Sequence, residues 1–209
     1  MNVTAKPRLD TAIRAHLVPC LRADGFAGSG SKFWRVIAGW VQVVSVQGRR
    51  DGGSFAINLA VHPLAVPDRL GNQPDPKKIT EGLCEFRRRL SETDSDQWWN
   101  HDGTEDSMNV AASAASLVYI EVGRPLLEHV SGPGAPLNVV TAEEFDKDSF
   151  DFSGFSSTKI RMALTLARFR LSQGLANDSA AFARIGLANL GSASALRQDL
   201  EQLAVAPLC

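Results

Sequence analysis

Three consecutive arginines, one cysteine and a tryptophan pair occur within residues 83–99, LCEFRRRLSETDSDQWW. Arginine binds carboxylates and phosphates through two parallel hydrogen bonds, so this stretch is a candidate anion site. The lone thiol of Cys84 has no histidine beside it in the sequence, and such a thiol is more often packed than reactive. The stretch therefore predicts either anion binding or a well-packed helix, followed by tryptophans that fill and cover a core.

The apolar residues of this stretch predict a short helix over residues 79–90. Its buried stripe consists of apolar residues at helical spacing: Ile79, Leu83, Phe86 and Leu90. On such a helix Arg87 and Arg89 lie on opposite borders of the stripe, and Arg88 lies on the far side. Border arginines cover the core with their stems and direct the guanidinium groups to the sheet rim or to an anion. An amphipathic helix with flanking ion pairs is the favoured interpretation, because surface charge pairs are common.

Upstream of the arginines, three runs of β-branched and aromatic residues predict strands over residues 33–37, 40–47 and 54–62. The strongest hairpin signal in the chain, Asp51-Gly52-Gly53, joins the last two runs. In the third run, SFAINLAVH, large apolar side chains alternate with small or polar ones, so the two faces of the strand differ. The small-residue face carries Ala56, Asn58 and Ala60. Three short strands joined by tight turns predict an antiparallel meander.

The remaining elements of the chain are predicted to be helices. Apolar residues at helical spacing predict a helix over residues 9–23, which Pro19 should kink or split. A long helix is expected to begin near Thr104 and to weaken at residues 123–125. Three further helices are expected within residues 157–205, and each has an apolar stripe that needs a partner.

We therefore expect an α+β fold with an antiparallel sheet of three strands or slightly more. The helices at residues 9–23 and 79–90 should pack on this sheet, and the C-terminal half should be mainly helical. The segment TAEEF, which begins at Thr141, has the spacing of a capping box. We place an α+β domain at residues 1–140 and a docked helical extension at residues 141–209.

The composition is that of an ordinary globular protein, with 44% hydrophobic residues, 22% charged residues and a formal net charge of −1. The charges are unevenly distributed. Residues 1–84 hold 11 basic and 6 acidic residues, residues 85–156 hold 5 and 14, and residues 157–209 hold 6 and 3. Such a distribution favours internal ion pairs, and the absence of a long basic cluster argues against nucleic-acid binding.

The cysteines Cys20, Cys84 and Cys209 are odd in number and far apart, which predicts a reducing, cytoplasmic setting. No Cys/His pair has the spacing of zinc ligands and no cofactor-binding motif is present, so we expect neither a metal nor a cofactor. We also expect no membrane association, because the N-terminal segment lacks an apolar core and no apolar run reaches about 18 residues.

Several short motifs follow one another in a fixed order along the chain. They are GF at 25–26, FWR at 33–35, VQ at 46–47, SFAINL at 54–59, C-x-x-R-x-R-L at 84–90 and WW at 98–99. This ordered set resembles a bacterial family of domains of unknown function, DUF4304. The resemblance covers residues 9–130 and implies a shared domain without an assigned reaction. The segment from residue 141 lies outside it.

The resemblance also indicates where a binding site would lie. The candidate ligand-binding residues are polar or aromatic side chains within these motifs: Arg35, Gln47, Asn58, Arg87, Arg89, Trp98 and Trp99. We expect a helix to pack on the small-residue face around Asn58, because one face of a sheet must be covered. If that face is open instead, Asn58 and Gln47 together with two arginines form a pocket suited to a carboxylate or phosphate.

These features support two functions. The favoured one is a non-enzymatic domain that binds a protein partner or a small anionic ligand. The alternative is an enzyme that acts on a phosphate-bearing substrate through Arg35, Arg87 and Arg89, with Glu85 or Asp51 as the base. A concave pocket with converging polar groups would favour a ligand or substrate, and an exposed apolar patch without such a pocket would favour a protein partner.

Overall fold

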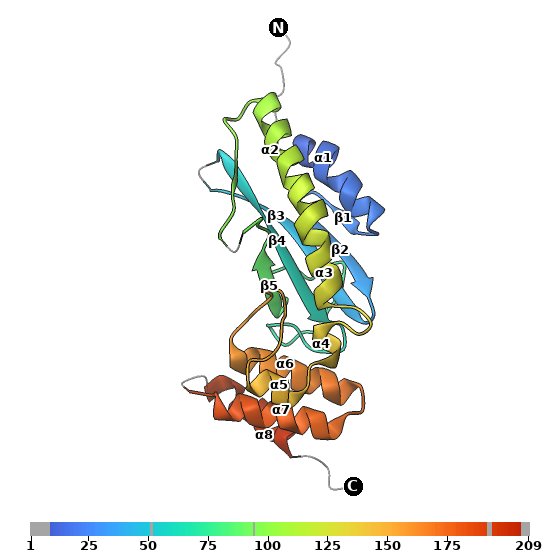
Figure 1. The fold of residues 1–209 in the computed structure, drawn as a ribbon, viewed down its shortest axis with the longest axis vertical. Helices are drawn as coiled ribbons and strands as arrows, with labels where there is room; N and C mark the ends of the chain where they lie inside the picture. Colours follow the sequence, from blue (N-terminus) through green and yellow to red (C-terminus); the bar gives the residue numbers. More distant parts are fainter. Residues whose placement is uncertain (1–8, 51, 94, 192–193, 206–209) are drawn as a thin grey trace.

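The computed structural model describes residues 9–50, 52–93, 95–191 and 194–205. These residues form an antiparallel sheet with helices on one face, and a group of helices beyond one end of the sheet (Figure 1). The fold is therefore α+β with a mainly helical C-terminal half, as predicted. Asp51 of the predicted hairpin turn and Cys209 lie outside the described residues.

Within the described part of the chain the sheet contains six strands, all of them paired antiparallel. The strands are β1 (Ala27–Ser29), β2 (Lys32–Ile37), β3 (Trp40–Gly48), β4 (Ser54–Pro63), β5 (Phe86–Arg89) and β6 (Trp99–Asn100). Strands β1 to β5 are neighbours in chain order, and β6 pairs with β4. The predicted meander is confirmed as β2, β3 and β4, and three short strands enlarge it.

The predicted helix over residues 79–90 is wrong, because its second half forms strand β5. Phe86 and Leu90 are four residues apart, a spacing at which side chains share a face in a strand as well as in a helix. The edge of β4 decides between the two, because its backbone groups need partners: the Leu90 N–H donates to the Ile57 carbonyl over 2.9 Å. The three arginines therefore alternate between the faces of a sheet instead of spreading around a helix.

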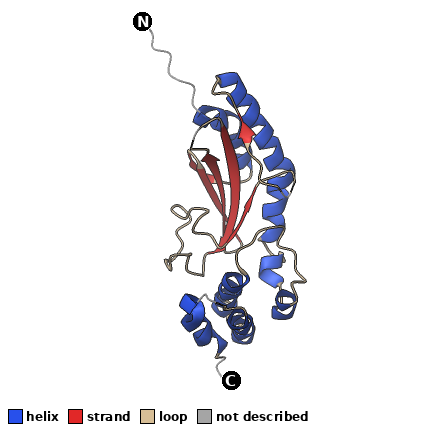
Figure 2. Cartoon of the chain, turned by 90° about the vertical axis from the view of Figure 1, so that its left-hand side faces the viewer, coloured by secondary structure: helices blue, strands red, loops and turns tan. Residues whose placement is uncertain are grey.

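Helices cover the apolar face of the sheet. Among the described residues two helices lie on this side, and a loop lies on the other (Figure 2). One helix is α1 (Leu9–Ala23), and the other is a long helix built from α2 (Glu105–Val118), the π-helical turn η1 (Tyr119–Gly123) and α3 (Arg124–Val130). The large residues of β4 beneath the helices are fully buried: Phe55, Ile57, Leu59 and Val61. Helix α1 is a single helix, so Pro19 does not split it.

The long helix begins as predicted, because the Thr104 hydroxyl accepts a hydrogen bond from the Ser107 N–H over 3.3 Å. The helix does not end at the predicted weak point, residues 123–125, but its α-helical pattern changes to the π-helical turn that ends at Gly123. Gly123 packs closely, since a methyl group at this position would lie 3.1 Å from Leu90. By length and composition residues 105–130 could cross a membrane, because an 18-residue window within them has a mean hydropathy of 1.3, but the helix packs on α1 and β6. The absence of membrane association stays a prediction.

The C-terminal half contains five α-helices among the described residues. They are α4 (Pro136–Val139), α5 (Ala142–Asp146), α6 (Lys159–Ser172), α7 (Ala176–Ala188) and α8 (Arg197–Ala204). The predicted capping box is confirmed, with reciprocal hydrogen bonds between Thr141 and Glu144 at the start of α5. The three helices predicted within residues 157–205 are α6, α7 and α8.

These helices are docked on the end of the sheet. The Phe169 ring of α6 meets the Trp40 ring of β3 edge to face, with the ring centroids 4.9 Å apart. The Phe152 ring, which precedes α6, meets the Phe86 ring of β5 at 5.7 Å. One hydrophobic core includes buried residues from α1 through α8. The helical extension is therefore packed on the sheet, and a domain boundary at residue 140 stays a prediction.

Candidate anion-binding site

A loop covers only part of the small-residue face of the sheet. The loop at residues 64–84 packs on one end of this face. A small buried cluster forms there from Val41, Val43, Ala60, Ile79 and Cys84. At the other end Gln47 is exposed and Asn58 is half-buried. No helix of the described chain packs on this end. The expected helix over Asn58 is therefore absent from the described chain, and this end of the face is open.

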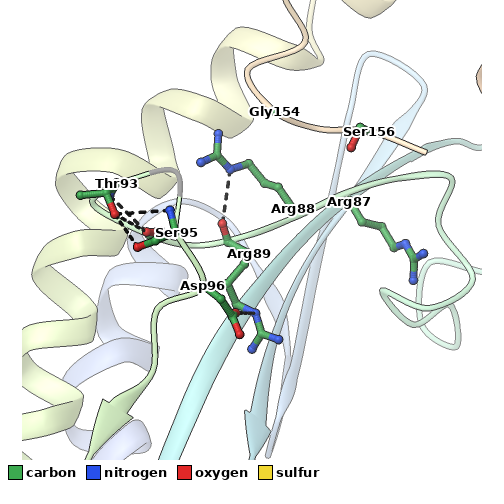
Figure 3. A pocket seen from close by; sticks show the side chains of 9 residues that line it. Arg87, Arg88, Arg89, Thr93, Ser95, Asp96, Gly154 and Ser156 are labelled. Atoms are coloured by element: carbon green, nitrogen blue, oxygen red, sulfur yellow. Dashed lines mark hydrogen bonds and ion pairs between the residues drawn. The ribbon is translucent and has the colours of Figure 1, made fainter. Parts of the chain in front are cut away.

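The uncovered end is hollowed into a cleft, which we term the arginine cleft. It consists of two adjoining hollows that share Arg87, Arg88, Arg89, Asp96 and Ser156. The hydroxyl hollow, of about 480 Å³, is also lined by Ser91, Thr93, Ser95 and Gly154 (Figure 3). The amide hollow, of about 430 Å³, is also lined by Gln47, Asn58 and Glu81. The structure thus brings together four of the seven predicted site residues: Gln47, Asn58, Arg87 and Arg89.

The register of the sheet explains why these residues converge. In antiparallel strands, residues directly opposite one another project to the same face. Asn58 of β4 lies opposite Arg89 of β5, and Ala60 lies opposite Arg87. Arg87 and Arg89 therefore share the small-residue face with Asn58. Arg88 belongs to the other face, and Figure 3 shows it directed away from the other two arginines.

Arg89 is held in place by the loop that follows β5. Its Nε lies 3.1 Å from Oδ1 of Asp96, and its Cζ lies 4.8 Å from the centroid of the Trp98 ring. The Trp98 Nε1–H donates to Oδ2 of Asp96 over 2.9 Å, so the three side chains form one unit. Nη1 of Arg89 is enclosed and has no hydrogen-bond partner among the described residues. Sequence reasoning missed Asp96, whose only signal is its place two residues before Trp98.

Arg87 is exposed, and its guanidinium group makes no ion pair with the described residues. Its backbone N–H and carbonyl pair with those of Ser156, which fixes this edge of the sheet. Burial lowers the pKa of the Arg69 guanidinium group below its usual value. The nearby carboxylate of Glu85 opposes this shift, and the positive charges of Arg161 and Arg87 add to it. The charges of Arg87 and Arg69 therefore repel each other.

Arg88 connects the cleft to the segment before α6. Its Nη1 donates to the carbonyl of Ser153, and its Nε donates to the carbonyl of Arg89 over 3.3 Å. Gly154 leaves room for this contact, because a Cβ at that position would lie 3.0 Å from Nη1 of Arg88. One wall of the hydroxyl hollow is therefore built by the segment that joins α5 to α6.

Gln47 and Asn58 form an amide pair in the amide hollow. The Asn58 side-chain amide donates to Oε1 of Gln47 over 3.2 Å and to the Ser45 hydroxyl over 3.5 Å. The remaining amide atoms, Oδ1 of Asn58 and Nε2 of Gln47, make no hydrogen bond with the described residues. One acceptor and one donor are therefore available in this hollow, beside the carboxylate of Glu81.

The structure does not bring Arg35 or Trp99 to the cleft. Arg35 lies in β2 opposite Gln42, on the face that the helices cover, and its Nε donates to Oε1 of Gln42 over 2.7 Å. Trp99 is 6% exposed and stacks on Phe55 with the ring centroids 5.7 Å apart. Both side chains stabilise the covered side of the sheet, and Trp98 is the half-buried indole of the tryptophan pair.

Glu85, one of the two residues considered as a catalytic base, does not line the cleft. Glu85 is 2% exposed, and its carboxylate accepts two hydrogen bonds from Arg161 over 2.9 Å and one from Ser157 over 2.6 Å. Asp51 lies outside the described residues. Burial raises the pKa of the Cys84 thiol, which keeps it protonated and unreactive. Among the described residues no group of three or more His, Cys, Asp or Glu side chains is placed to hold a metal ion.

Comparison with known proteins confirms the resemblance that the motifs indicated. No curated protein and no solved structure matches the chain. One family model does match, over residues 17–129, which includes every strand of the sheet and most of the helices that cover it. The segment with Gly154 and Ser156 lies beyond the match. The chain therefore belongs to the family described as "Domain of unknown function (DUF4304)".

Proposed function

We propose that this protein binds a small anionic ligand, one that carries a phosphate or carboxylate group, in the arginine cleft. One observation carries the proposal: Arg87 and Arg89 lie on the same face of the sheet and line a cleft together with Gln47 and Asn58. Each hollow has a volume within the range of about 300–1,000 Å³ that is typical of small-molecule sites. The lining offers the donors that an oxyanion requires.

The state of the two arginines supports this proposal. The guanidinium group of Arg87 has no ion pair among the described residues, and Nη1 of Arg89 has no hydrogen-bond partner there. Asp96 pairs with Nε of Arg89 and leaves the other end of that guanidinium group unpaired with a carboxylate. Each hydrogen bond to a charged group contributes about 1.5–3 kcal/mol. We expect the lower end of that range for Arg87, because this side chain is exposed to solvent.

Two other functions have weaker support. A protein partner would be favoured by one apolar patch, but the exposed large apolar residues are spread over several elements: Val36, Leu70, Val110, Leu117, Val139, Leu171, Leu175 and Val205. The enzyme alternative required Arg35 beside the other arginines and Glu85 or Asp51 as a base. Arg35 and Glu85 are engaged elsewhere in the structure.

Isothermal titration calorimetry with inorganic phosphate tests the proposal. We expect wild type and Arg14→Ala, which removes an exposed arginine of α1, to bind phosphate equally. The double variant Arg87→Ala/Arg89→Ala should not bind it. In a thermal-shift assay, phosphate at about 100 times its Kd should stabilise the wild type by about 2.7 kcal/mol. For a chain of 209 residues this corresponds to a rise in Tm of about 5–10 °C.

Equal phosphate binding by wild type and the double variant would overturn the proposal. Arg89→Ala also removes one partner each from Asp96 and Trp98, so the fold of the double variant needs a check by circular dichroism. Its unfolding would favour a structural role for the arginines. Arg87→Ala alone avoids this difficulty, because Arg87 is exposed. We expect it to keep the wild-type Tm and to lose about tenfold in phosphate affinity, or about 1.4 kcal/mol.

A further inference from the structure

We infer that the ligand of the arginine cleft is a phosphorylated polyol, such as a sugar phosphate. The phosphate would lie against Arg87 and Arg89, and the hydroxyl groups would lie in the amide hollow. This inference rests on the proposed function and adds the chemical class of the ligand. Three properties of the lining support it.

The first property is that both hollows are lined by residues of polar types and by one glycine. Arginine, serine, threonine, asparagine, glutamine, aspartate, glutamate and glycine line them, and no aromatic or aliphatic residue is among these. Nucleobases bind by stacking on aromatic rings, and such a surface is missing from the described lining. The nearby Trp98 ring does not provide one, because Arg89 and Arg49 approach it, with Cζ 4.8 and 5.8 Å from its centroid.

The second property is the mixture of donors and acceptors in the amide hollow. Oδ1 of Asn58 and the carboxylate of Glu81 can each accept hydrogen bonds from a ligand, and Nε2 of Gln47 can donate two. An alcohol hydroxyl both donates and accepts, so neighbouring hydroxyls of a sugar can satisfy all three side chains. A carboxylate or a second phosphate could satisfy only the donor. This end of the cleft is therefore suited to an uncharged polyhydroxylated group.

The third property is the distribution of charge along the cleft. Glu81 and Asp96 both line the amide hollow, and their negative charges repel any second anionic group of a ligand. The positive charges of Arg87 and Arg89 attract a single anionic end. In the hydroxyl hollow, by contrast, Thr93 and Ser95 bond to each other over 2.6 Å, so these hydroxyls are already engaged. The structure thus favours a ligand with one anionic end and one polyol end.

Calorimetry with four matched compounds tests this inference on the wild-type chain. The compounds are inorganic phosphate, ribose, ribose 5-phosphate, which joins these two parts, and AMP, which adds adenine to ribose 5-phosphate. We expect ribose 5-phosphate to bind at least tenfold more tightly than inorganic phosphate. AMP should bind no more than threefold more tightly than ribose 5-phosphate, and ribose alone should bind more weakly than either phosphate ester.

A variant of the amide hollow identifies where the sugar binds. In Asn58→Ala/Glu81→Ala we expect the affinity for ribose 5-phosphate to fall to that for inorganic phosphate, while the affinity for inorganic phosphate does not fall. Glu92→Ala removes an exposed acidic residue of the loop after β5 that lines neither hollow, and it should behave as wild type.

The outcomes separate this inference from the proposed function. If ribose 5-phosphate binds less than tenfold more tightly than inorganic phosphate, or if AMP binds more than threefold more tightly than ribose 5-phosphate, the polyol inference is wrong and anion binding stands. If the hollow variant binds ribose 5-phosphate as wild type does, the inference is also wrong. If inorganic phosphate and both esters fail to bind the wild type, the proposed function fails together with the inference.

Discussion

Replacement of Glu85 by alanine should weaken the attachment of the sheet to helix α6. The Glu85 carboxylate bonds to Arg161 and Ser157, and the side chains of Glu85 and Arg161 are 3% and 25% exposed. Removing one partner of a buried ion pair costs about 3–5 kcal/mol when the other charge stays buried. Arg161 can regain water, so we expect a loss of about 2–3 kcal/mol in the free energy of unfolding. For 209 residues this lowers Tm by about 4–12 °C.

Urea denaturation and calorimetry of wild type, Glu85→Ala and Glu143→Ala measure this effect. Glu143 is the matched control, because it pairs with Lys147 on the surface, where the two side chains are 76% and 66% exposed. Loss of such a surface pair should change the stability by less than about 0.5 kcal/mol. In Glu85→Ala/Arg161→Ala no uncompensated charge remains, so the loss should be smaller than the sum of the two single losses. A Glu85→Ala variant as stable as Glu143→Ala would refute the reasoning.

Three further substitutions test other parts of the structure. Gly28→Ala should lower the free energy of unfolding, measured by urea denaturation, by about 2–4 kcal/mol, because the φ of Gly28 is +104° and a Cβ would collide with the carbonyl of Lys32. Gly30→Ala is the control, and it should lower the free energy of unfolding by about 1 kcal/mol, because Gly30 has a φ of +64° but open space around it. Burial lowers the pKa of His62 from 6.5, so its imidazole is protonated more readily in the unfolded chain than in the folded one. The neutral imidazole therefore contributes its full stability above about pH 6.5, and this contribution is lost as the pH falls below that value. Urea midpoints of wild type and His62→Gln, measured against pH, test this. Equal slopes for the two proteins below about pH 6.5 would contradict it. Trp98→Leu should weaken phosphate binding about three- to tenfold, because Arg89 loses its aromatic contact; unchanged affinity in calorimetry would show that the ring is not needed.

Much of the fold could be predicted because the relevant signals are local. The alternation of large and small residues over residues 54–62 correctly predicted the two faces of β4. Thr104 and the Thr141–Glu144 pair marked helix starts, since their side chains bond to backbone groups three residues away. Such patterns depend on neighbours in the chain, so they can be recognised without knowledge of the packing.

Strand β5 could not be predicted in this way. The spacing of Phe86 and Leu90 fits a helix and a strand equally well, and the partner that selects the strand is Ile57, which is far away in the sequence. The same limit explains the placement of Arg35. Only the register of β2 with β3 reveals that Arg35 lies beside Gln42 under the helices, and not beside the arginines of β5.

The candidate site was predicted in part for a related reason. Gln47 and Asn58 could be identified because they are polar residues within apolar strands. The alternation of side chains within each strand assigns them to the small-residue face, whichever element pairs with β4. Arg87 and Arg89 were predicted as candidate anion ligands, and they line the cleft although their predicted helix was wrong. Every second residue of a strand shares a face, so the strand brings both guanidinium groups to one side more directly than the helix would have done. Asp96 lies in a loop, where no repeating pattern of residues predicts the direction of a side chain, so its contact with Arg89 could not be predicted from the sequence.

Protection of the sheet edge is an alternative explanation for three arginines on β5, because charged residues on edge strands prevent pairing with other chains. The described structure already covers this edge by other means. The backbone of Arg87 pairs with Ser156, and Arg88 bonds to the carbonyl of Ser153 in the same segment. Edge protection also requires no particular orientation of the charges. Arg87 and Arg89 instead project from the face above Asn58, and this orientation is the feature that favours a bound anion over a protected edge.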